Sequence, residues 1–219
     1  MPVLGFSRQA STSSWFDTRA GHILLRAEQA MAHAALQRGI VHPWLWIRVA
    51  TQPSLIMRPR GRGICVVRQG RRFTGDLRCG MSLPLATESI QSIIIQHSLV
   101  CHPDDLLCEC ARVLKPGGRI WVFVLNPYSP YRLHWRGLRC TALPSYRWQA
   151  VLAQVGLTCI TAPQYVGPIW HPQRLHQQQC GPGRPWQAAC LLVAQKRTLA
   201  MTPLIQQELM TWHKPVTVV

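Results

Sequence analysis

The stretch RVLKPGGRIWVFVLNP, residues 112–127, joins the end of an amphipathic helical pattern to a strongly apolar run. The run RIWVFVL (119–125) is apolar almost throughout, so the strand it forms should be covered on both faces. Pro116, Gly117 and Gly118 lie between the two elements and favour a sharp reversal at the helix end, because glycine readily adopts left-handed backbone angles. A helix that leads through such a corner into a buried strand is typical of an α/β fold.

The segments on either side continue this alternation. The spacing of apolar residues predicts helices over 17–38, 103–114 and 145–156. Asp17 and Ser145 are placed to cap two of them. Apolar and β-branched runs predict strands at 44–50, 64–67, 90–100, 119–125, 156–166 and 186–197. Because no helix separates the last two strands, we expect a doubly wound, mostly parallel sheet that ends in an antiparallel pair.

Length and composition indicate one ordinary domain with extensions. The chain has 219 residues, and 47% of them are hydrophobic. No apolar run approaches the ~18 residues that a membrane span needs, and the first residues lack the apolar core of a signal peptide. Nine scattered cysteines without a CxxC pair indicate reduced thiols and no metal site. We therefore expect a cytoplasmic protein with an N-terminal extension (1–14), one domain (15–197) and a C-terminal tail (198–219).

The charge balance is strongly basic. Lys and Arg number 24 against 8 Asp and Glu, which gives a formal net charge of +16. Such a balance favours a polyanionic partner such as nucleic acid, although arginines scattered by compositional drift would give the same total. The densest regions are Arg58–Arg72 and Arg132–Arg139. A nucleic-acid partner therefore stays open, and the sequence indicates no particular oligomeric state.

A set of motifs between residues 82 and 127 resembles a known family. The motifs are Leu83-Pro84-Leu85, Gln96-His97, Pro103-Asp104 and Leu114-Lys115-Pro116-Gly117-Gly118. This pattern resembles the class I S-adenosylmethionine-dependent methyltransferases of the type 11-like family. The resemblance implies a Rossmann-like, doubly wound, mostly parallel seven-stranded sheet with a C-terminal antiparallel hairpin. It also implies that S-adenosyl-L-methionine lies across the carboxyl ends of the first, second and fourth strands, with the methyl acceptor above the fourth and fifth.

The resemblance also implies site residues. The cofactor would contact Ala50 and Thr51 after the first strand, Gln69 after the second, Gly80 and Met81 before the fourth, and Gln96 at its end. His97 would orient the acceptor or act as a general base. Asn126 and Tyr128 would contact the acceptor at the end of the fifth strand. The alternatives are that His97 packs beneath the following helix and hydrogen-bonds backbone, and that Asn126-Pro127 simply ends a strand.

The sequence departs from the family pattern where the cofactor should bind. WIRVATQPS (46–54) has no glycine in the turn after the first strand, and no carboxylate follows the second strand. Asp76 lies too early for the adenine loop, and Gln91 stands where the fourth strand of the family normally begins with an Asp. Two functions follow. One is a methyltransferase acting on a small-molecule or nucleotide-like acceptor. The other is a catalytically weak or inactive protein of the same fold that binds RNA or a partner.

Overall fold

A computed structural model describes residues 15–37, 42–49, 58–99, 103–135, 142–169 and 185–197. Its helices are α1 (Arg19–Gln37), α2 (Pro103–Val113), α3 (Ser145–Gln154) and the short 3-10 helix η1 (Pro130–Trp135). Its strands are β1 (Trp44–Val49), β2 (Gly63–Gln69), β3 (Arg72–Gly75), β4 (Ile90–Gln96), β5 (Leu114–Leu125), β6 (Leu157–Cys159), β7 (Gln164–Ile169) and β8 (Gln187–Lys196). The expected segments 1–14 and 198–219 lie outside the described residues.

The strands form one mixed sheet in the order β3-β2-β1-β4-β5-β8-β6, and β7 also pairs with β8. Strands β2, β1, β4 and β5 run parallel, whereas β8 is antiparallel to β5, β6 and β7. The predicted mostly parallel sheet with antiparallel C-terminal strands is therefore confirmed. The sheet has eight strands because residues 160–163 divide the last edge strand into β6 and β7, which follow the same side of β8.

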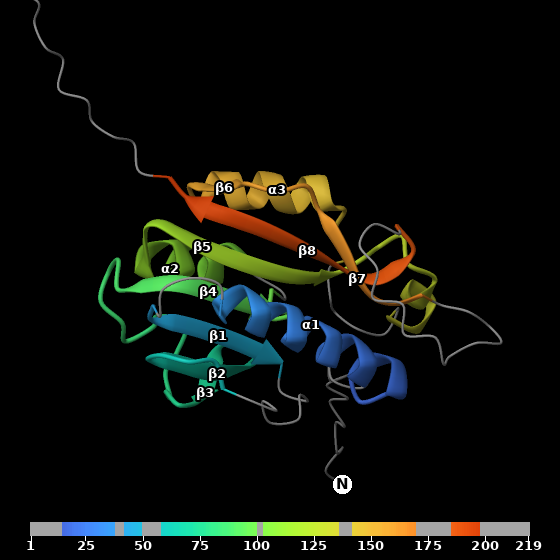
Figure 1. Ribbon diagram of the computed structural model, residues 1–219, viewed down its shortest axis with the longest axis horizontal. Helices are drawn as coiled ribbons and strands as arrows, with labels where there is room; N and C mark the ends of the chain where they lie inside the picture. Colours follow the sequence, from blue (N-terminus) through green and yellow to red (C-terminus); the bar gives the residue numbers. More distant parts are fainter. Residues whose placement is uncertain are drawn as a thin grey trace, which may run out of the picture.

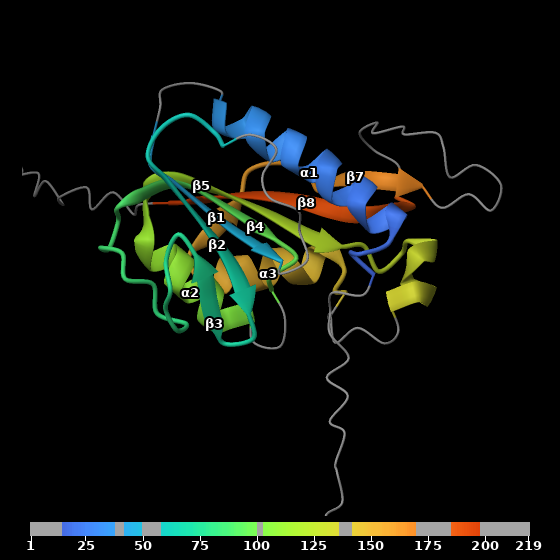
Figure 2. The same cartoon turned by 90° about the horizontal axis from the view of Figure 1, so that it is seen from below.

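Helices cover the two faces of the sheet unequally. Figures 1 and 2 show α1 on one face and both α2 and α3 on the other. Under α2 and α3, a large apolar core includes Leu107, Cys110 and Trp148. Under α1, the apolar residues form two smaller clusters, around Trp46 and around Phe16. Helix α1 therefore packs against the sheet with both apolar and polar side chains, because Glu28 and Gln29 are also buried on it.

The stretch at 112–127 differs from expectation in one detail. Helix α2 ends at Val113 and β5 begins at once with Leu114, so Gly117 lies inside the strand. Gly117 has a φ of 72°, and the register with β4 shifts between the pairs Ile90–Leu114 and Ser92–Arg119. The glycine freedom at this corner therefore serves a bulge in β5, which the amide of Gln195 holds by donating to the Gly117 carbonyl at 3.0 Å.

The start of α1 is capped by a different residue from the one expected. Thr18 Oγ1 accepts a hydrogen bond from the Gly21 amide at 3.2 Å and donates to the Trp15 carbonyl at 2.7 Å. The side chain of Thr18, rather than that of Asp17, therefore satisfies a free amide of the first turn. At α3, Pro144 occupies the position before the helix, and no side chain makes a capping hydrogen bond there.

No helix within the described ranges is long and apolar enough to cross a membrane.

A glycine at the start of β2 tests the packing of the α1 face. A Cβ at Gly63 would lie 1.8 Å from the Trp44 ring, and Trp44 is 2% exposed. We expect Gly63→Ala to lower the free energy of unfolding by about 1–3 kcal/mol, the usual cost of overpacking. Urea denaturation measures this change in the free energy of unfolding. Gly80→Ala is the matched control, because a Cβ there meets nothing within 4 Å. An equal loss of stability in both variants would contradict the close packing of Gly63 against Trp44.

Candidate functional site

The topology of the sheet predicts where a ligand binds. Strand β1 lies between β2 and β4, so the chain moves outward from β1 in one direction and then returns to its other side. In sheets of this kind, ligands bind outside the carboxyl ends of the strands at this switch point. The ends are Val49, Gln69 and Gln96. Ala50 and Thr51, predicted to contact the cofactor, lie outside the described residues.

A buried polar network lies at the end of β4, on the face covered by α1. His97 Nε2 and Glu28 Oε1 are 2.8 Å apart, and the Gln96 amide donates to Glu28 Oε2 at 3.1 Å. The Trp46 indole donates to Gln96 Oε1 at 2.6 Å. Glu28 and Gln96 are 0% exposed and His97 is 5% exposed. The network therefore joins α1, β1 and β4 and uses both ends of the Gln96 amide.

The network orients the imidazole through Nε2, which lies 2.8 Å from Glu28 Oε1. An ionised carboxylate would only accept hydrogen bonds and would therefore place the ring proton on Nε2. Nδ1, the other ring nitrogen, is buried and has no hydrogen-bond partner among the residues described. The arrangement thus orients a buried imidazole through one nitrogen and leaves the second without a partner among the described residues.

The backbone at His97 is also unusual. Its φ is 46°, a left-handed conformation that few residues other than glycine adopt. The His97 amide donates to the Phe123 carbonyl at 3.0 Å, which holds this turn against β5. Conformations of this kind cost about 1–3 kcal/mol and occur often at functional sites. The geometry therefore marks the end of β4 as a candidate site independently of the side-chain network.

An aromatic cluster surrounds the same end of the sheet. The ring centroids of Phe16 and His97 are 4.8 Å apart. The centroid of the Trp15 ring lies 5.2 Å from that of Phe16, 5.8 Å from that of Tyr131 and 5.2 Å from that of Trp135. The Tyr131 hydroxyl and the Trp135 indole nitrogen are buried without a hydrogen-bond partner in the described ranges. Buried polar atoms are usually paired with protein, water or ligand. Three unpaired polar atoms in one connected cluster therefore indicate a place where a polar ligand or water binds.

At the end of β2, the guanidinium of Arg68 lies next in the chain to the side-chain amide of Gln69. Arg68 donates from Nε to the Gly70 carbonyl at 2.9 Å and from Nη1 to the Ser98 carbonyl. It therefore crosses from β2 to the segment after β4, near the position where the family would use a carboxylate. Gln69 is exposed, and its side-chain oxygen can accept hydrogen bonds from ribose hydroxyls. The described residues thus offer one acceptor for a ribose, next to a guanidinium that can only donate.

The loop before β4 is held by α2. Arg112 donates to the carbonyls of Leu83 and Leu85 at 3.0 and 2.9 Å, and to Glu109 at 2.6 Å. Glu109 in turn accepts from the Leu83 amide at 2.7 Å. This Arg112–Glu109 clamp fixes the loop that follows the predicted cofactor residues.

Those two residues, Gly80 and Met81, differ in their surroundings. Gly80 is exposed, with open space where a Cβ would be. The half-buried Met81 packs against the core under α2. Backbone at Gly80 is thus accessible to a flat ring such as adenine.

The two predicted acceptor-binding residues have different surroundings. The Asn126 amide donates to the carbonyls of Pro185 and Gln187 at 2.7 and 2.8 Å, and its oxygen accepts from the Tyr128 amide at 3.1 Å. Asn126 is 1% exposed, so it holds the loop after β5 against the start of β8. Tyr128 is 56% exposed and is the residue that this loop presents to solvent.

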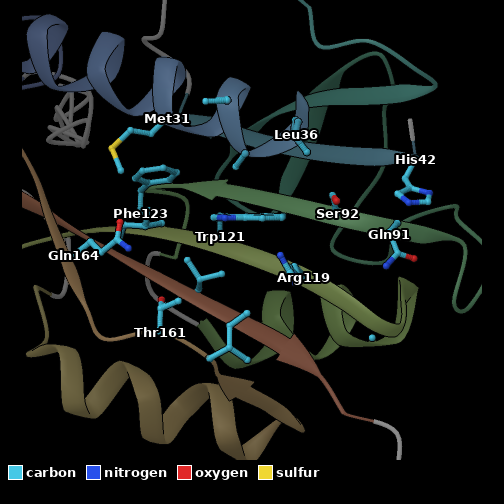
Figure 3. A pocket seen from close by; sticks show the side chains of 16 residues that line it. Met31, Leu36, His42, Gln91, Ser92, Arg119, Trp121, Phe123, Thr161 and Gln164 are labelled. Atoms are coloured by element: carbon cyan, nitrogen blue, oxygen red, sulfur yellow. The ribbon is translucent and has the colours of Figure 1, made fainter. Parts of the chain in front are cut away.

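A groove of about 720 Å³ opens elsewhere on the α1 face (Figure 3). Trp121 and Phe123 of β5 form its floor with Leu191 and Val193 of β8, and Met31 of α1 forms part of a wall. It extends from the beginning of β4 and Arg119 to Phe123, on the side of α1 toward β6 and β7. The groove therefore lies over the amino end of β4 and the middle of β5 and β8, and neither Gln69 nor Gly80 lines it.

Sequence reasoning missed the residues that organise this edge. Glu28 was part of an amphipathic helix, and only its position in an otherwise apolar stripe with Leu24, Leu25 and Ala32 could have indicated burial. Phe16 and Arg112 carried no motif. The pattern located His97 and Gln96 at the end of β4, and their hydrogen-bond partners are 69 and 68 residues away in the chain.

Comparisons with known proteins agree with this topology. A family model described as "Methyltransferase domain" matches residues 68–122, from the end of β2 into β5. A search of curated proteins finds no match. Two of the solved structures that are similar over most of the chain have TM-scores above 0.5. A SAM-dependent methyltransferase from Thermotoga maritima, described as a possible histamine N-methyltransferase, has a TM-score of 0.55 at 15% identity and covers 84% of this chain and 93% of its own.

The second is a putative methyltransferase from Haloferax volcanii, solved in complex with the Trm112 methyltransferase activator. Its TM-score is 0.53 at 13% identity, over 85% of this chain and 98% of its own. At such identities the likeness shows the fold. The predicted resemblance to methyltransferases is confirmed over residues 68–122 by the family model, and the solved structures confirm the predicted fold.

The Arg112–Glu109 clamp should make stability depend on pH. The hydrogen bond from Arg112, with the one from the Leu83 amide, lowers the pKa of Glu109 below its usual value of 4.5, although burial opposes them. A lowered folded pKa contributes stability that is complete above the unfolded pKa and is lost as pH falls through the folded one.

We therefore expect Arg112→Met to lower the free energy of unfolding at pH 7, because it leaves Glu109 and the loop carbonyls without their donor, and the difference from wild type to narrow below about pH 4.5. Urea denaturation from pH 3 to pH 7 measures both effects. Arg147→Met, an exposed change on α3, is the control and should show neither. A gap that stays constant across this range would rule out the clamp as its source.

Proposed function

We propose that this protein is a SAM-dependent methyltransferase that acts on a small-molecule or nucleotide-like acceptor at the carboxyl ends of β1, β2 and β4. The observation that carries the proposal is the Glu28–His97 pair. A buried imidazole stands at the end of β4, strained in its backbone, held through Nε2 and unpaired at Nδ1. A protein that used this fold only as a scaffold would gain nothing from leaving that nitrogen without a partner.

The residues present are compatible with S-adenosyl-L-methionine. Gln69 would accept from the ribose hydroxyls, and the open backbone at Gly80 would receive the adenine beside Met81. Arg68 is the departure, because it supplies a donor where the ribose hydroxyls need an acceptor. We therefore expect weaker cofactor binding than a carboxylate at the end of β2 would give. Ala50 and Thr51 complete the proposed contacts from the sequence.

The chemistry asks little of the protein. When bound, the cofactor supplies a methyl group on an already reactive sulfonium, so alignment of the acceptor provides much of the rate. His97 Nδ1 would accept the proton of an acceptor N–H or O–H, while Glu28 holds Nε2–H and so keeps the ring in one orientation. Gln96 and Trp46 hold Glu28 and are positioning residues. Phe16 of the aromatic cluster packs against the imidazole and would help to fix its position.

Acceptor binding is proposed for the loop after β5. Asn126 holds this loop in place through three hydrogen bonds, which lets the exposed Tyr128 ring form a wall beside the end of β5. A flat acceptor would stack against such a ring. Asn126 therefore acts by shaping the loop, and Tyr128 by contacting the acceptor.

A second candidate function is a catalytically inactive protein of the same fold that binds a partner. Its supporting observation is Arg68, whose guanidinium crosses from β2 to the Ser98 carbonyl and introduces a positive charge beside a cofactor that is itself cationic at sulfur. Like charges in one site oppose binding. The two candidates differ in whether the purified protein binds the cofactor.

Titration with S-adenosylmethionine and with its demethylated product separates them. We expect calorimetry to detect both ligands at or below millimolar concentration, and methyl-labelled cofactor to transfer label to a small-molecule extract. His97→Gln should leave cofactor affinity within about threefold and reduce transfer at least 100-fold, the usual contribution of a general base. Glu28→Gln should reduce transfer less. Absence of binding at millimolar cofactor would overturn the methyltransferase proposal and favour the second candidate.

A carboxylate introduced at position 69 tests whether the cofactor ribose lies at the end of β2. Gln69→Glu would give the hydroxyls a charged acceptor, which binds roughly twice as strongly as a neutral one. It would also offset the charge of Arg68. We expect it to tighten S-adenosylmethionine binding about tenfold in calorimetry, whereas Gln69→Leu should weaken it. Equal affinities in the three proteins would show that the cofactor does not reach the end of β2.

A further inference from the structure

The β2–β3 edge of the sheet carries an unusual concentration of arginine. Between residues 58 and 78 the chain has seven arginines, no lysine, and Asp76 as its one acidic residue. The arginines are Arg58, Arg60, Arg62, Arg68, Arg71, Arg72 and Arg78. All except Arg68 are exposed. These residues, called the arginine edge below, include one of the two basic regions noted in the sequence, and the proposed methyl transfer does not require their charge.

The segment forms a single ribbon along the side of the sheet. Strand β3 is antiparallel to β2, with Gln69 opposite Arg72 and Val66 opposite Gly75. The chain then returns, because Phe73 and Cys79 form a further antiparallel bridge. Residues 58–62 lead into the amino end of β2, and Arg71 lies in the turn at its other end. Figure 1 shows β3 at the outer edge of the sheet, beyond β2.

Little negative charge opposes this edge. Asp76 accepts from Arg58 at 2.7 Å and from the Cys65 amide at 2.8 Å, so it is already occupied. Arg71 lies 3.8 Å from Asp105 on α2, and both side chains are largely exposed. Arg60, Arg62, Arg72 and Arg78 form no ion pair with any residue that the structure describes. Most of the positive charge therefore faces solvent.

The length of the edge suits a polyphosphate. Seven residues of β2 extend over roughly 20 Å, which corresponds to about six phosphates of one strand of a duplex at 3.4 Å each. Guanidinium groups bind phosphate oxygens with two parallel hydrogen bonds and keep their charge at every physiological pH. Charged side chains, lysine above all, also protect edge strands from aggregation, but this segment has no lysine and carries its charge on arginine.

The absence of exposed rings favours a duplex over a single strand. Proteins that hold single strands stack bases on exposed aromatic side chains. The large apolar side chains exposed in the described ranges are Tyr128, Leu133, Tyr146, Ile160 and Trp186, and none belongs to residues 58–78. Phe73, the aromatic residue of this segment, is 1% exposed and packs in the core. The edge therefore has the groups for the phosphate backbone and lacks those for bases.

We propose that the arginine edge binds the phosphate backbone of double-stranded nucleic acid without reading its sequence. The surface lies on the outer side of β2 and β3, so the bound duplex would run beside the sheet. The proposal does not depend on cofactor binding, because the exposed arginines that carry it are separate from Glu28 and His97.

Fluorescence anisotropy with a labelled 20-base-pair duplex, in RNA and in DNA form, tests the proposal on the full chain. The edge variant replaces Arg60, Arg62, Arg72 and Arg78 with Gln. The control variant replaces Arg26, Arg119, Arg132 and Arg147, which are exposed on other elements, so both lose four charges. We expect the wild type to bind with log K falling by about 3–4 per tenfold rise in salt, for about four phosphate contacts.

The edge variant should lose at least tenfold in affinity at 50 mM salt and most of its salt dependence, with the control changed much less. A companion variant with Lys at the same four positions should keep the salt dependence and lose part of the affinity. Lysine keeps the positive charge but cannot donate the two parallel hydrogen bonds that a guanidinium makes to phosphate. Thermal melts confirm that each variant folds, and the Lys variant serves the test if the Gln variant does not.

Four outcomes would overturn the proposal. They are no duplex binding by the wild type at 50 mM salt, equal losses in the edge and control variants, tighter binding of a 20-nucleotide single strand than of the duplex, and equal binding of polyglutamate. RNA and DNA duplexes that bind alike support backbone recognition, and a preference for one identifies the form that the edge fits.

Discussion

The carboxylate of Glu28 lies wholly inside the protein, and the arrangement of α1 on the sheet depends on how its charge is satisfied. It accepts from the Gln96 amide and pairs with His97, while Trp46 holds the other end of Gln96. Removing one partner of a buried pair typically costs 3–5 kcal/mol, because the other is left uncompensated. These contacts therefore favour the observed placement of the helix, with Glu28 at the end of β4.

The same constraint reaches the candidate site. The contact between Glu28 and Nε2 orients the His97 ring and therefore also its Nδ1. The turn at His97 has left-handed backbone angles, and the hydrogen bond from its amide to the Phe123 carbonyl holds it against β5. On the other face of the sheet, the Arg112–Glu109 clamp holds the loop before β4 by hydrogen bonds in the same way. The two faces thus position the two sides of one edge by hydrogen bonds from helices to loops.

Charge separates this edge from the side of the sheet. The described acidic residues Glu28, Glu109 and Asp76 are each engaged in a specific contact, whereas most arginines of the β2–β3 ribbon are not. Arg68 lies where the two regions meet, at the end of β2, with its guanidinium on the carbonyls of Gly70 and Ser98. A change at Arg68 would therefore act on both the proposed cofactor site and the adjoining surface, which is why the edge variant leaves it in place.

Residues 112–127 and their neighbours determined the fold class, because apolar periodicity and glycine position follow from local physics that operates within a few residues. The strand at 119–125, α2 and the end of β4 were predicted from such patterns, and so was the location of His97. The tertiary structure alone decided what His97 contacts, that Gly117 serves a bulge, and that Asn126 holds a loop. Each of these findings depends on a contact between residues far apart in the chain, such as Glu28 and His97, which are 69 residues apart. A local pattern records that a residue is buried or polar, whereas its hydrogen-bond partner is selected only when distant elements pack.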